Sequence, residues 1–240
     1  MLIGAFSAAV AAHFFHSVWI GIGAGMLAGA VTALLHGVLC IFLRSDPIIS
    51  GMAINFLALG IPPVVSKALF EMSGSTPSIS PEVKLQPVFG FSPIVLAFPF
   101  AILITWLVHN YTNFVVRLRF SGAHPSAVSA KGISVAKIRL QSILLCGMLC
   151  GIAGSYLSID HGSQFSRNMT AGRGFISLAA LILGRWNPVF AALGAFIFGS
   201  VEAFQILMQG VEIAGIGTVP VQWIQAVPYI VTLFILARIK

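Results

Sequence analysis

Charged residues are scarce in this sequence, and their scarcity excludes a water-soluble domain. Only 8% of the 240 residues are charged and 58% are hydrophobic, whereas an average soluble domain carries about 25% charged residues. The mean hydropathy is +1.00. The apolar residues fall into runs near the roughly 20 residues that a helix needs to cross a bilayer. The sequence therefore predicts an all-α polytopic transmembrane bundle, one domain over residues 1–240 with about six to seven spans, some of them broken or short.

Acidic residues and cysteines are also few. The 13 Lys and Arg against 6 Asp and Glu give a net charge of +7, yet no Arg-rich or aromatic-interleaved surface indicates a nucleic-acid partner. In a membrane protein, basic residues concentrate in the cytoplasmic loops. The 3 cysteines all lie in apolar runs, so no disulfide framework is expected. Cys146 and Cys150 share a helix face, and we interpret them as packing residues.

Signatures of catalysis are missing as well. No glycine-rich loop ends in Gly-Lys-Ser or Gly-Lys-Thr, and in the nearest stretch Lys131 is followed by Gly132. No His-Glu-x-x-His zinc helix is present, and Asp46 and Asp160 both fall in predicted loops. We expect no enzymatic activity, metal or cofactor in this chain, so that ATP hydrolysis, if it drives the protein, belongs to a partner. The histidines have no triad spacing and are interpreted as interfacial or packing residues: His13, His16, His36 and His109.

Prolines, glycines and charges divide the apolar runs into spans. The expected spans cover residues 17–43, 48–70, 91–116, 140–159, 189–208 and 222–237. Pro62 and Pro63 remove backbone donors and should kink or end the second span. A shorter apolar piece covers residues 174–184, which at 1.5 Å per residue reach across only about half of the hydrocarbon. Three alternatives are open for this piece. It extends back through Thr170, it forms a half-helix beside a substrate path, or it is a short span packed against longer neighbours.

Basic residues are divided unequally between the two sets of loops. Residues 117–139 hold five basic residues and no acidic one, so we place them in the cytoplasm. Nine basic residues then lie inside: Arg44, Arg117, Arg119, Lys131, Lys137, Arg139, Arg185, Arg238 and Lys240. Four lie outside: Lys67, Lys84, Arg167 and Arg173. The bias predicts a cytoplasmic C-terminus.

Small residues at four-residue spacing predict close helix contacts. The ladders are Gly21-Gly25-Gly29, Gly147-Gly151 and Ala195-Gly199. Glu202 lies in the same span as the third ladder, where a carboxylate costs several kcal/mol unless it is paired, hydrated or protonated. With Gln205 on the same face, it either lines a polar path or makes an interhelical hydrogen bond.

The basic stretch contains a readable helix signal. Pro125 suits a first helical position, and Gly132 suits the residue just past a helix end. The spacing predicts a short cytoplasmic helix of about two turns.

Three blocks of sequence resemble a known family. Residues 122–133, the glycine-rich span 146–154 and the stretch from Asn168-Met-Thr-Ala-Gly-Arg-Gly-Phe175 to Gly184-Arg-Trp-Asn-Pro188 resemble the permease subunits of bacterial ABC importers, in the branched-chain amino acid and simple sugar group. The third block is most similar to the nucleoside and simple sugar branch. The resemblance extends from about Gly4 to the C-terminus.

The resemblance implies a half-transporter in the bacterial cytoplasmic (inner) membrane. Its partners would be an ABC ATP-binding subunit, a second permease subunit in a homodimer or heterodimer, and an extracytoplasmic substrate-binding lipoprotein. Residues 123–131 would form the coupling helix that docks into the ATPase, with Gly122 and Gly132 at its ends. The coupling residues would be Gly122, Ala123, His124, Pro125, Ser126, Ala127, Lys131 and Gly132.

The chain departs from that family in two respects. His124 and Pro125 stand where the family more often has polar or acidic residues. Family members usually run longer, so the comparison predicts either a misassigned start or a reduced protein. Residues 1–15 lack a positively charged beginning and fit the second part of a helix better than a signal peptide.

The solute is expected to be a nucleoside or simple sugar. A branched-chain amino acid is the alternative on the same scaffold, but no acidic and basic pair within the expected spans looks built for a zwitterion. A non-transporting membrane scaffold or intramembrane enzyme is the alternative from another class. Polarity and position nominate five residues for the solute path: Gln164, Asn168, Thr170, Glu202 and Gln205.

Overall fold

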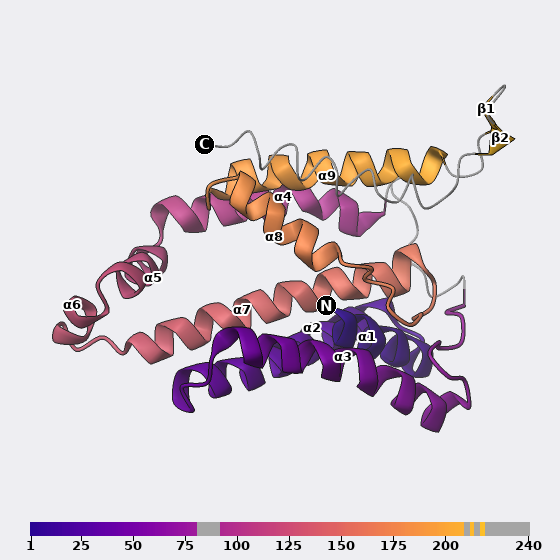
Figure 1. Ribbon diagram of the computed structural model, residues 1–240, viewed down its shortest axis with the longest axis horizontal. Coiled ribbons are helices and arrows are strands. Elements are labelled where there is room, and N and C mark those ends of the chain that lie inside the picture. The colour runs from indigo at the N-terminus through magenta and orange to yellow at the C-terminus, as the bar shows by residue number, and fades with distance from the viewer. Residues whose placement is uncertain (81–91, 209–211, 214–216, 219–240) are drawn as a thin grey trace. The chain divides into compact units, whose positions relative to one another are not determined.

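Helices account for most of the described chain. The computed structural model describes residues 1–80, 92–208, 212–213 and 217–218 (Figure 1). The helices are α1 (Leu2–Phe15), α2 (Val18–Gly37), α3 (Pro47–Phe70), α4 (Pro93–Tyr111), α5 (Asn113–Ala123), α6 (Pro125–Ala130), α7 (Val135–Ser155), α8 (Arg173–Leu183) and α9 (Pro188–Met208). Short π-helical turns, η1 (Val38–Phe42) and η3 (Tyr156–His161), continue α2 and α7. Two short strands, β1 (Glu212–Ile213) and β2 (Gly217–Thr218), pair antiparallel.

Within the described residues, 5 helices are long and apolar enough to cross a membrane. They cover Val18–Phe42, Pro47–Phe70, Pro93–Tyr111, Val135–His161 and Pro188–Leu207. Two shorter apolar helices are Leu2–Phe15 and Arg173–Leu183. The predicted all-α polytopic bundle is confirmed, and the span predicted over 222–237 lies outside the described residues.

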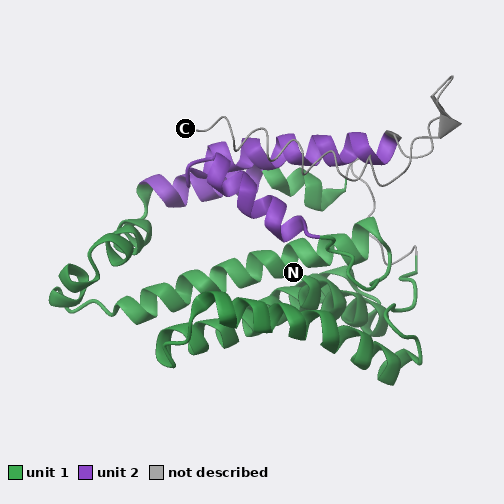
Figure 2. Cartoon of the chain, viewed as in Figure 1, with its two compact units in different colours: residues 1–98, 111–171 green, residues 99–110, 172–240 purple. Residues whose placement is uncertain are grey.

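The contacts divide the chain into two compact units, coloured separately in Figure 2. Unit 1 comprises residues 1–98 and 111–171, and unit 2 comprises residues 99–110 and 172–240. Unit 1 contains α1, α2, α3 and α7 together with α5 and α6. Unit 2 contains α8 and α9.

Glycines let the central helices of unit 1 meet backbone to backbone. A Cβ built on Gly4 of α1 would lie 2.8 Å from the Gly151 Cα of α7 and 3.1 Å from the Gly25 carbonyl oxygen of α2. A Cβ on Gly29 would meet the Gly147 carbonyl oxygen and lie 2.9 Å from the Gly151 Cα. The two predicted ladders on α2 and α7 are therefore confirmed as the surfaces on which these helices pack.

A loop residue completes the core of unit 1. Phe165, 1% exposed, packs its ring edge-on against Phe6 of α1, with the ring centroids 5.2 Å apart. Leu2, Ala5 and Ala9 of the same helix surround the contact. The segment after η3 is thus folded down onto the helices.

The structure settles three boundaries. The span predicted over residues 48–70 is confirmed as α3, and Pro62 and Pro63 do not end it, because a membrane span tolerates prolines whose freed carbonyl groups neighbours can satisfy. The third span ends at Tyr111 instead of residue 116, since Thr112 is extended and a separate helix follows. The apolar piece near residue 174 does not extend back through Thr170, because Ala171 and Gly172 have φ values of 41° and 79°.

Two packing predictions are also wrong. Cys146 and Cys150 are exposed on α7 rather than packed within the chain. The ladder of Ala195 and Gly199 is exposed too, and a Cβ on Gly199 would meet nothing within 4 Å. Spacing alone did not tell which face of a helix meets a neighbour, because it fixes only which residues share a face.

Candidate functional site

The predicted cytoplasmic helix is present as α6. Pro125 is its first residue, and Gly132 follows it with a φ of 73°. The Gly132 amide donates to the Ser129 carbonyl at 2.9 Å, and this closes the end of the helix. Gly122 and Ala123 lie instead at the end of α5, and His124 separates the two helices. The predicted helix over residues 123–131 is therefore shorter, because Pro125 has no amide proton with which to continue α5.

The connection from α5 through α6 is fastened to the rest of unit 1. Ser121 is 1% exposed, and its carbonyl accepts a hydrogen bond from Arg139 Nη2 of α7 at 3.2 Å. Val128 is the buried residue of α6, at 7% exposure. The contacts of Ser121, Arg139 and Val128 were not predicted from the sequence. An apolar residue in the middle of a short polar helix is a signal for its buried face.

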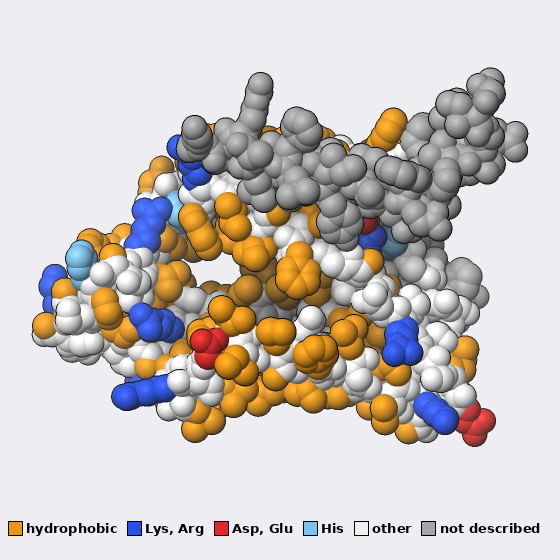
Figure 3. Space-filling model, in the orientation of Figure 1, with side chains coloured by type: hydrophobic (Ala, Val, Ile, Leu, Met, Phe, Trp, Pro, Cys, Tyr) orange, Lys and Arg blue, Asp and Glu red, His pale blue; other side chains and the backbone are white. Residues whose placement is uncertain are grey.

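All eight predicted coupling residues are exposed in the structure. Lys and Arg side chains gather over the same end of unit 1, where α5 and α6 lie (Figure 3). A short helix with one buried anchor, an exposed outer face and basic neighbours has the form of a docking surface.

Two loops on unit 1 are joined by hydrogen bonds. The Thr76 amide donates to the Phe165 carbonyl at 3.1 Å, and the Phe165 amide donates to Thr76 Oγ1 at 3.0 Å. The Ile79 amide donates to the Ser163 carbonyl at 2.7 Å, and the Ser66 hydroxyl donates to the Ser75 carbonyl. The segment 162–171 is consequently held against residues 72–80.

Three of the predicted path residues lie on this fastened segment. Gln164 and Asn168 are exposed, and Thr170 is half-buried. Asn168 has a φ of 59°, a left-handed conformation that costs an asparagine little. Glu202 and Gln205, the other two, are half-buried on α9 of unit 2. The five predicted residues are thus divided between the two units.

Glu202 has a charged partner on the neighbouring helix. Its Oε1 lies 2.6 Å from Arg173 Nη2, and the two side chains are 29% and 26% exposed. No acidic and basic pair was expected within the spans, because Arg173 was assigned to an outer loop. The signal that could have found it is an arginine at the first position of a short apolar helix, near a lone acid in the next span.

A tight turn brings α8 and α9 together. Arg185 and Trp186 have φ values of 48° and 62°, and the Asn187 side chain accepts from the Val189 amide at 3.0 Å to begin α9. A Cβ on Gly184 would lie 2.6 Å from the Ala191 Cα. The Gly-Arg-Trp-Asn-Pro block is therefore the hairpin between these helices.

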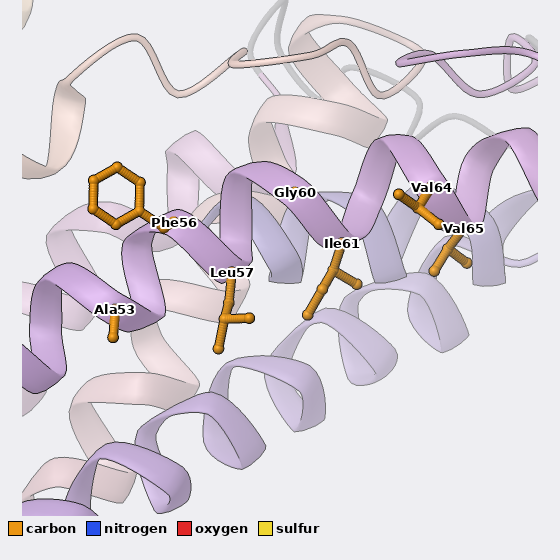
Figure 4. Close-up of a pocket in the computed structure, with 7 residues that line it drawn as sticks. All are labelled: Ala53, Phe56, Leu57, Gly60, Ile61, Val64 and Val65. Carbon is orange, nitrogen blue, oxygen red and sulfur yellow. The ribbon is translucent and has the colours of Figure 1, made fainter.

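A groove of about 740 Å³ along α3 carries no recognition chemistry. Its lining comes entirely from this one helix (Figure 4): Ala53, Phe56, Leu57, Gly60, Ile61, Val64 and Val65. These residues offer no side-chain donor or acceptor for a polar solute. The groove fits a surface in contact with apolar neighbours rather than a solute site.

Comparisons with known proteins match almost the whole chain. The profile of a family described as branched-chain amino acid transport system / permease component matches residues 1–236. The chain is 33% identical to the nucleoside ABC transporter permease protein NupC of Lactococcus lactis over 99% of this chain and 80% of the relative. It is 31% identical to the guanosine ABC transporter permease protein NupQ of Bacillus subtilis, over 98% and 79%. A putative glucose ABC transporter permease protein of Haloferax volcanii is 26% identical over 89% and 68%. No solved structure matches.

Proposed function

This chain belongs to the family of branched-chain amino acid transport system permease components, and from that premise we propose that it carries a nucleoside inward as the membrane-spanning subunit of an ATP-driven importer. It is a multi-pass protein of the bacterial inner membrane. A permease subunit is not itself an enzyme. ATP hydrolysis is assigned to a separate subunit.

The choice of a nucleoside rests on one observation. Two relatives at 33% and 31% identity, each matched over nearly all of this chain, are a nucleoside and a guanosine permease. The charges at Arg173 and Glu202 neutralise each other, which fits an uncharged solute better than a zwitterion needing a free charge of each sign. Simple sugars remain within the same branch, and the Haloferax relative supports that second solute class.

The docking surface for the ATPase is proposed to be α6 and the residues flanking it. The support is structural: all eight residues from Gly122 to Gly132 that were predicted to couple are exposed, and Val128 and Ser121 fix the segment from beneath. A helix held in this way transmits a push to α7 through the contact of Arg139 with Ser121. The basic residues around it support a cytoplasmic location for this end by the positive-inside rule.

The remaining partners follow from the architecture of an importer. We assign a second permease subunit as the other half of the bundle and an extracytoplasmic substrate-binding lipoprotein as the source of the solute. Gln164, Asn168 and Thr170 stand on the fastened outer segment and, with Glu202 and Gln205, are proposed to meet the solute. The two compact units are proposed to be parts of one permease domain over residues 1–240.

Uptake of labelled nucleosides into proteoliposomes tests the solute class. The assembly, copurified with its ATPase and supplied with its binding protein, should accumulate guanosine or uridine when ATP is present. Unlabelled nucleosides should compete, and leucine should not. Competition by leucine alone would overturn the nucleoside in favour of a branched-chain amino acid.

Gly132 tests the coupling surface. Its φ of 73° is strained for a residue with a side chain, so Gly132→Val should distort the end of α6 and reduce uptake about tenfold while ATP hydrolysis continues. Gly51→Val is the matched control, since Gly51 lies on α3 outside the coupling segment and has no neighbour within 4 Å of a Cβ. Normal uptake by Gly132→Val would contradict the coupling assignment.

A further inference from the structure

The ion pair of Arg173 and Glu202 joins two apolar helices. Glu202 belongs to the candidate span Pro188–Leu207 and stands about 21 Å along the axis of α9 from Pro188 and about 8 Å from Leu207, at 1.5 Å per residue. Arg173 is the first residue of α8 and reaches Glu202 at 2.6 Å. Isolated charges within an apolar span are unfavourable. The pairing therefore accounts for how both are tolerated.

The partial exposure of the pair indicates what it faces. The two side chains keep 26% and 29% of their surface exposed, and charged groups at membrane depth avoid lipid and face water or protein. The helix α8 measures only about 16 Å at 1.5 Å per residue, which is too short to cross the bilayer. Short helices of this kind are tolerated where they line a cavity inside a protein. A partly exposed ion pair beside such a short helix fits the wall of a watery path.

The local charge balance explains why the acid is on α9. The amino-terminal end of α8 carries a partial positive charge from its helix dipole, and Arg173 adds a full one. The first turn of α8 has no acidic residue, and its N-cap, Gly172, makes no side-chain hydrogen bond. Glu202 supplies a negative charge from the neighbouring helix.

Resting on the proposed import of nucleosides, we propose that Arg173 and Glu202 are positioning and specificity-determining residues. Their ion pair holds the amino-terminal end of α8 against α9. Their mutual neutralisation keeps this wall of the path without net charge, so that uncharged solutes pass and ionic solutes are disfavoured. The close contact of Gly184 with Ala191 holds the other end of the hairpin.

Charge-altering variants in the reconstituted transporter test the positioning role, with tritiated adenosine, guanosine, cytidine and uridine as the probe. Glu202→Gln removes the negative charge and leaves the positive charge of Arg173 beside the positive end of the α8 dipole. Because these charges repel, uptake should fall at least about tenfold. Arg173→Gln leaves Glu202 facing the partial charge of the helix end, so the loss should be smaller, about threefold to tenfold. The charge-reversed double variant, Arg173→Glu with Glu202→Arg, should recover to within about threefold of wild type.

The matched control is Ser200→Ala. Ser200 lies on α9 and bonds the Phe196 carbonyl of its own helix at 2.8 Å, so its loss should leave uptake unchanged. If both single variants import within twofold of wild type, or if charge reversal is no better than the worse single variant, the positioning role is overturned.

Competition by charged analogues tests the specificity role, which a purely structural contact would not affect. Glu202→Gln should become several-fold more sensitive to inhibition by nucleoside 5′-monophosphates, which are anions. Arg173→Gln should become more sensitive to cationic 5′-amino-5′-deoxynucleosides. The same binding protein serves every assay, so differences between variants belong to this chain. Equal sensitivity in all variants would contradict the specificity role.

The pair is also measurable without transport. If the wild-type assembly imports no nucleoside, the proposed solute class is wrong. Thermal unfolding of the purified assembly then tests whether the ion pair holds α8 to α9. Both single variants should melt below wild type, or yield less assembled protein, and charge reversal should restore the loss. No recovery on charge reversal would show that the pair does not hold α8 to α9.

Discussion

The helices inside unit 1 and the helices inside unit 2 are held together by different kinds of contact. In unit 1, α1, α2 and α7 meet through glycines at backbone distance, with the Gly4 position 2.8 Å from the Gly151 Cα. In unit 2, α8 and α9 meet through a tight turn, two small residues and an ion pair between Arg173 and Glu202. Lipid gives helices no hydrophobic reason to associate, so packing and polar contacts must supply the affinity. The helices α1, α2 and α7 of unit 1 associate through close packing, and in unit 2 an ion pair adds to the packing of α8 against α9.

The glycine contacts and the ion pair have different roles. The glycine contacts of unit 1 leave no room for a side chain and no polar group to present, so they fix a shape. The ion pair of unit 2 stays about one-quarter exposed and can respond to what passes it. Mutations of the glycine contacts in unit 1 should therefore act through stability alone, whereas mutations of the ion pair in unit 2 should also change transport.

The largest loss of stability is expected at Phe165. Phe165→Ala empties a fully buried site against Phe6 and should lower the free energy of unfolding by about 3 to 5 kcal/mol. Phe175→Ala is the control, because that ring is 71% exposed. Thermal unfolding of the purified protein measures both, and similar melting temperatures for the two variants would contradict the role of Phe165 in the core.

Gly29→Ala tests the glycine contact directly. The added methyl group would meet the Gly147 carbonyl and approach the Gly151 Cα, and an overpacked contact with backbone should cost about 3 kcal/mol. Gly23→Ala on the same helix has nothing within 4 Å of the new Cβ and should be neutral or slightly stabilising. If yield and melting temperature of the two alanine variants agree, the comparison between the units loses its basis.

The corresponding change in unit 2 is Gly184→Ala. Its Cβ would lie 2.6 Å from the Ala191 Cα and 2.8 Å from the Phe190 carbonyl carbon, and because both residues follow within the same hairpin and can shift with its turn, we expect a cost of about 2 kcal/mol. Gly174→Ala on the same helix meets nothing within 4 Å and is the control. A larger loss at Gly184 than at Gly29 in thermal unfolding would reverse the ranking of the two units.

A helix cap provides the smallest effect. The Asp46 carboxylate accepts from the Ile48 and Ile49 amides at 2.7 and 3.2 Å at the start of α3. Asp46→Ala should cost about 1 kcal/mol and leave uptake intact. Asp46→Asn keeps an acceptor and should recover most of the loss. If Asp46→Ala abolished uptake, this residue would have a role beyond the cap.

Features of the fold that depend on residues near one another in the sequence could be predicted. Apolar runs gave the long spans, the spacing of Pro125 and Gly132 gave the short helix α6, and glycine ladders gave the α2 and α7 surfaces. Whether Pro62 and Pro63 end the helix was left open, since this depends on which neighbours satisfy the freed carbonyl groups.

The contacts of the candidate site were less accessible from the sequence. Glu202 was identified from its depth alone, but its partner depends on how α8 and α9 approach each other, and no spacing rule encodes that. Phe165 lies in a segment that looked polar, and only its hydrogen bonds with Thr76 show why it turns inward. Tertiary contacts between distant segments decide such cases.

Isolation of the tagged chain from membranes, with mass spectrometry of what copurifies, tests the central claim most directly. A permease subunit of an ATP-driven importer should bring down an ABC ATPase and a second permease subunit in stoichiometric amounts. The Gly132→Val variant should recover the second permease subunit but less of the ATPase. Recovery of neither partner with the wild-type chain would contradict the account.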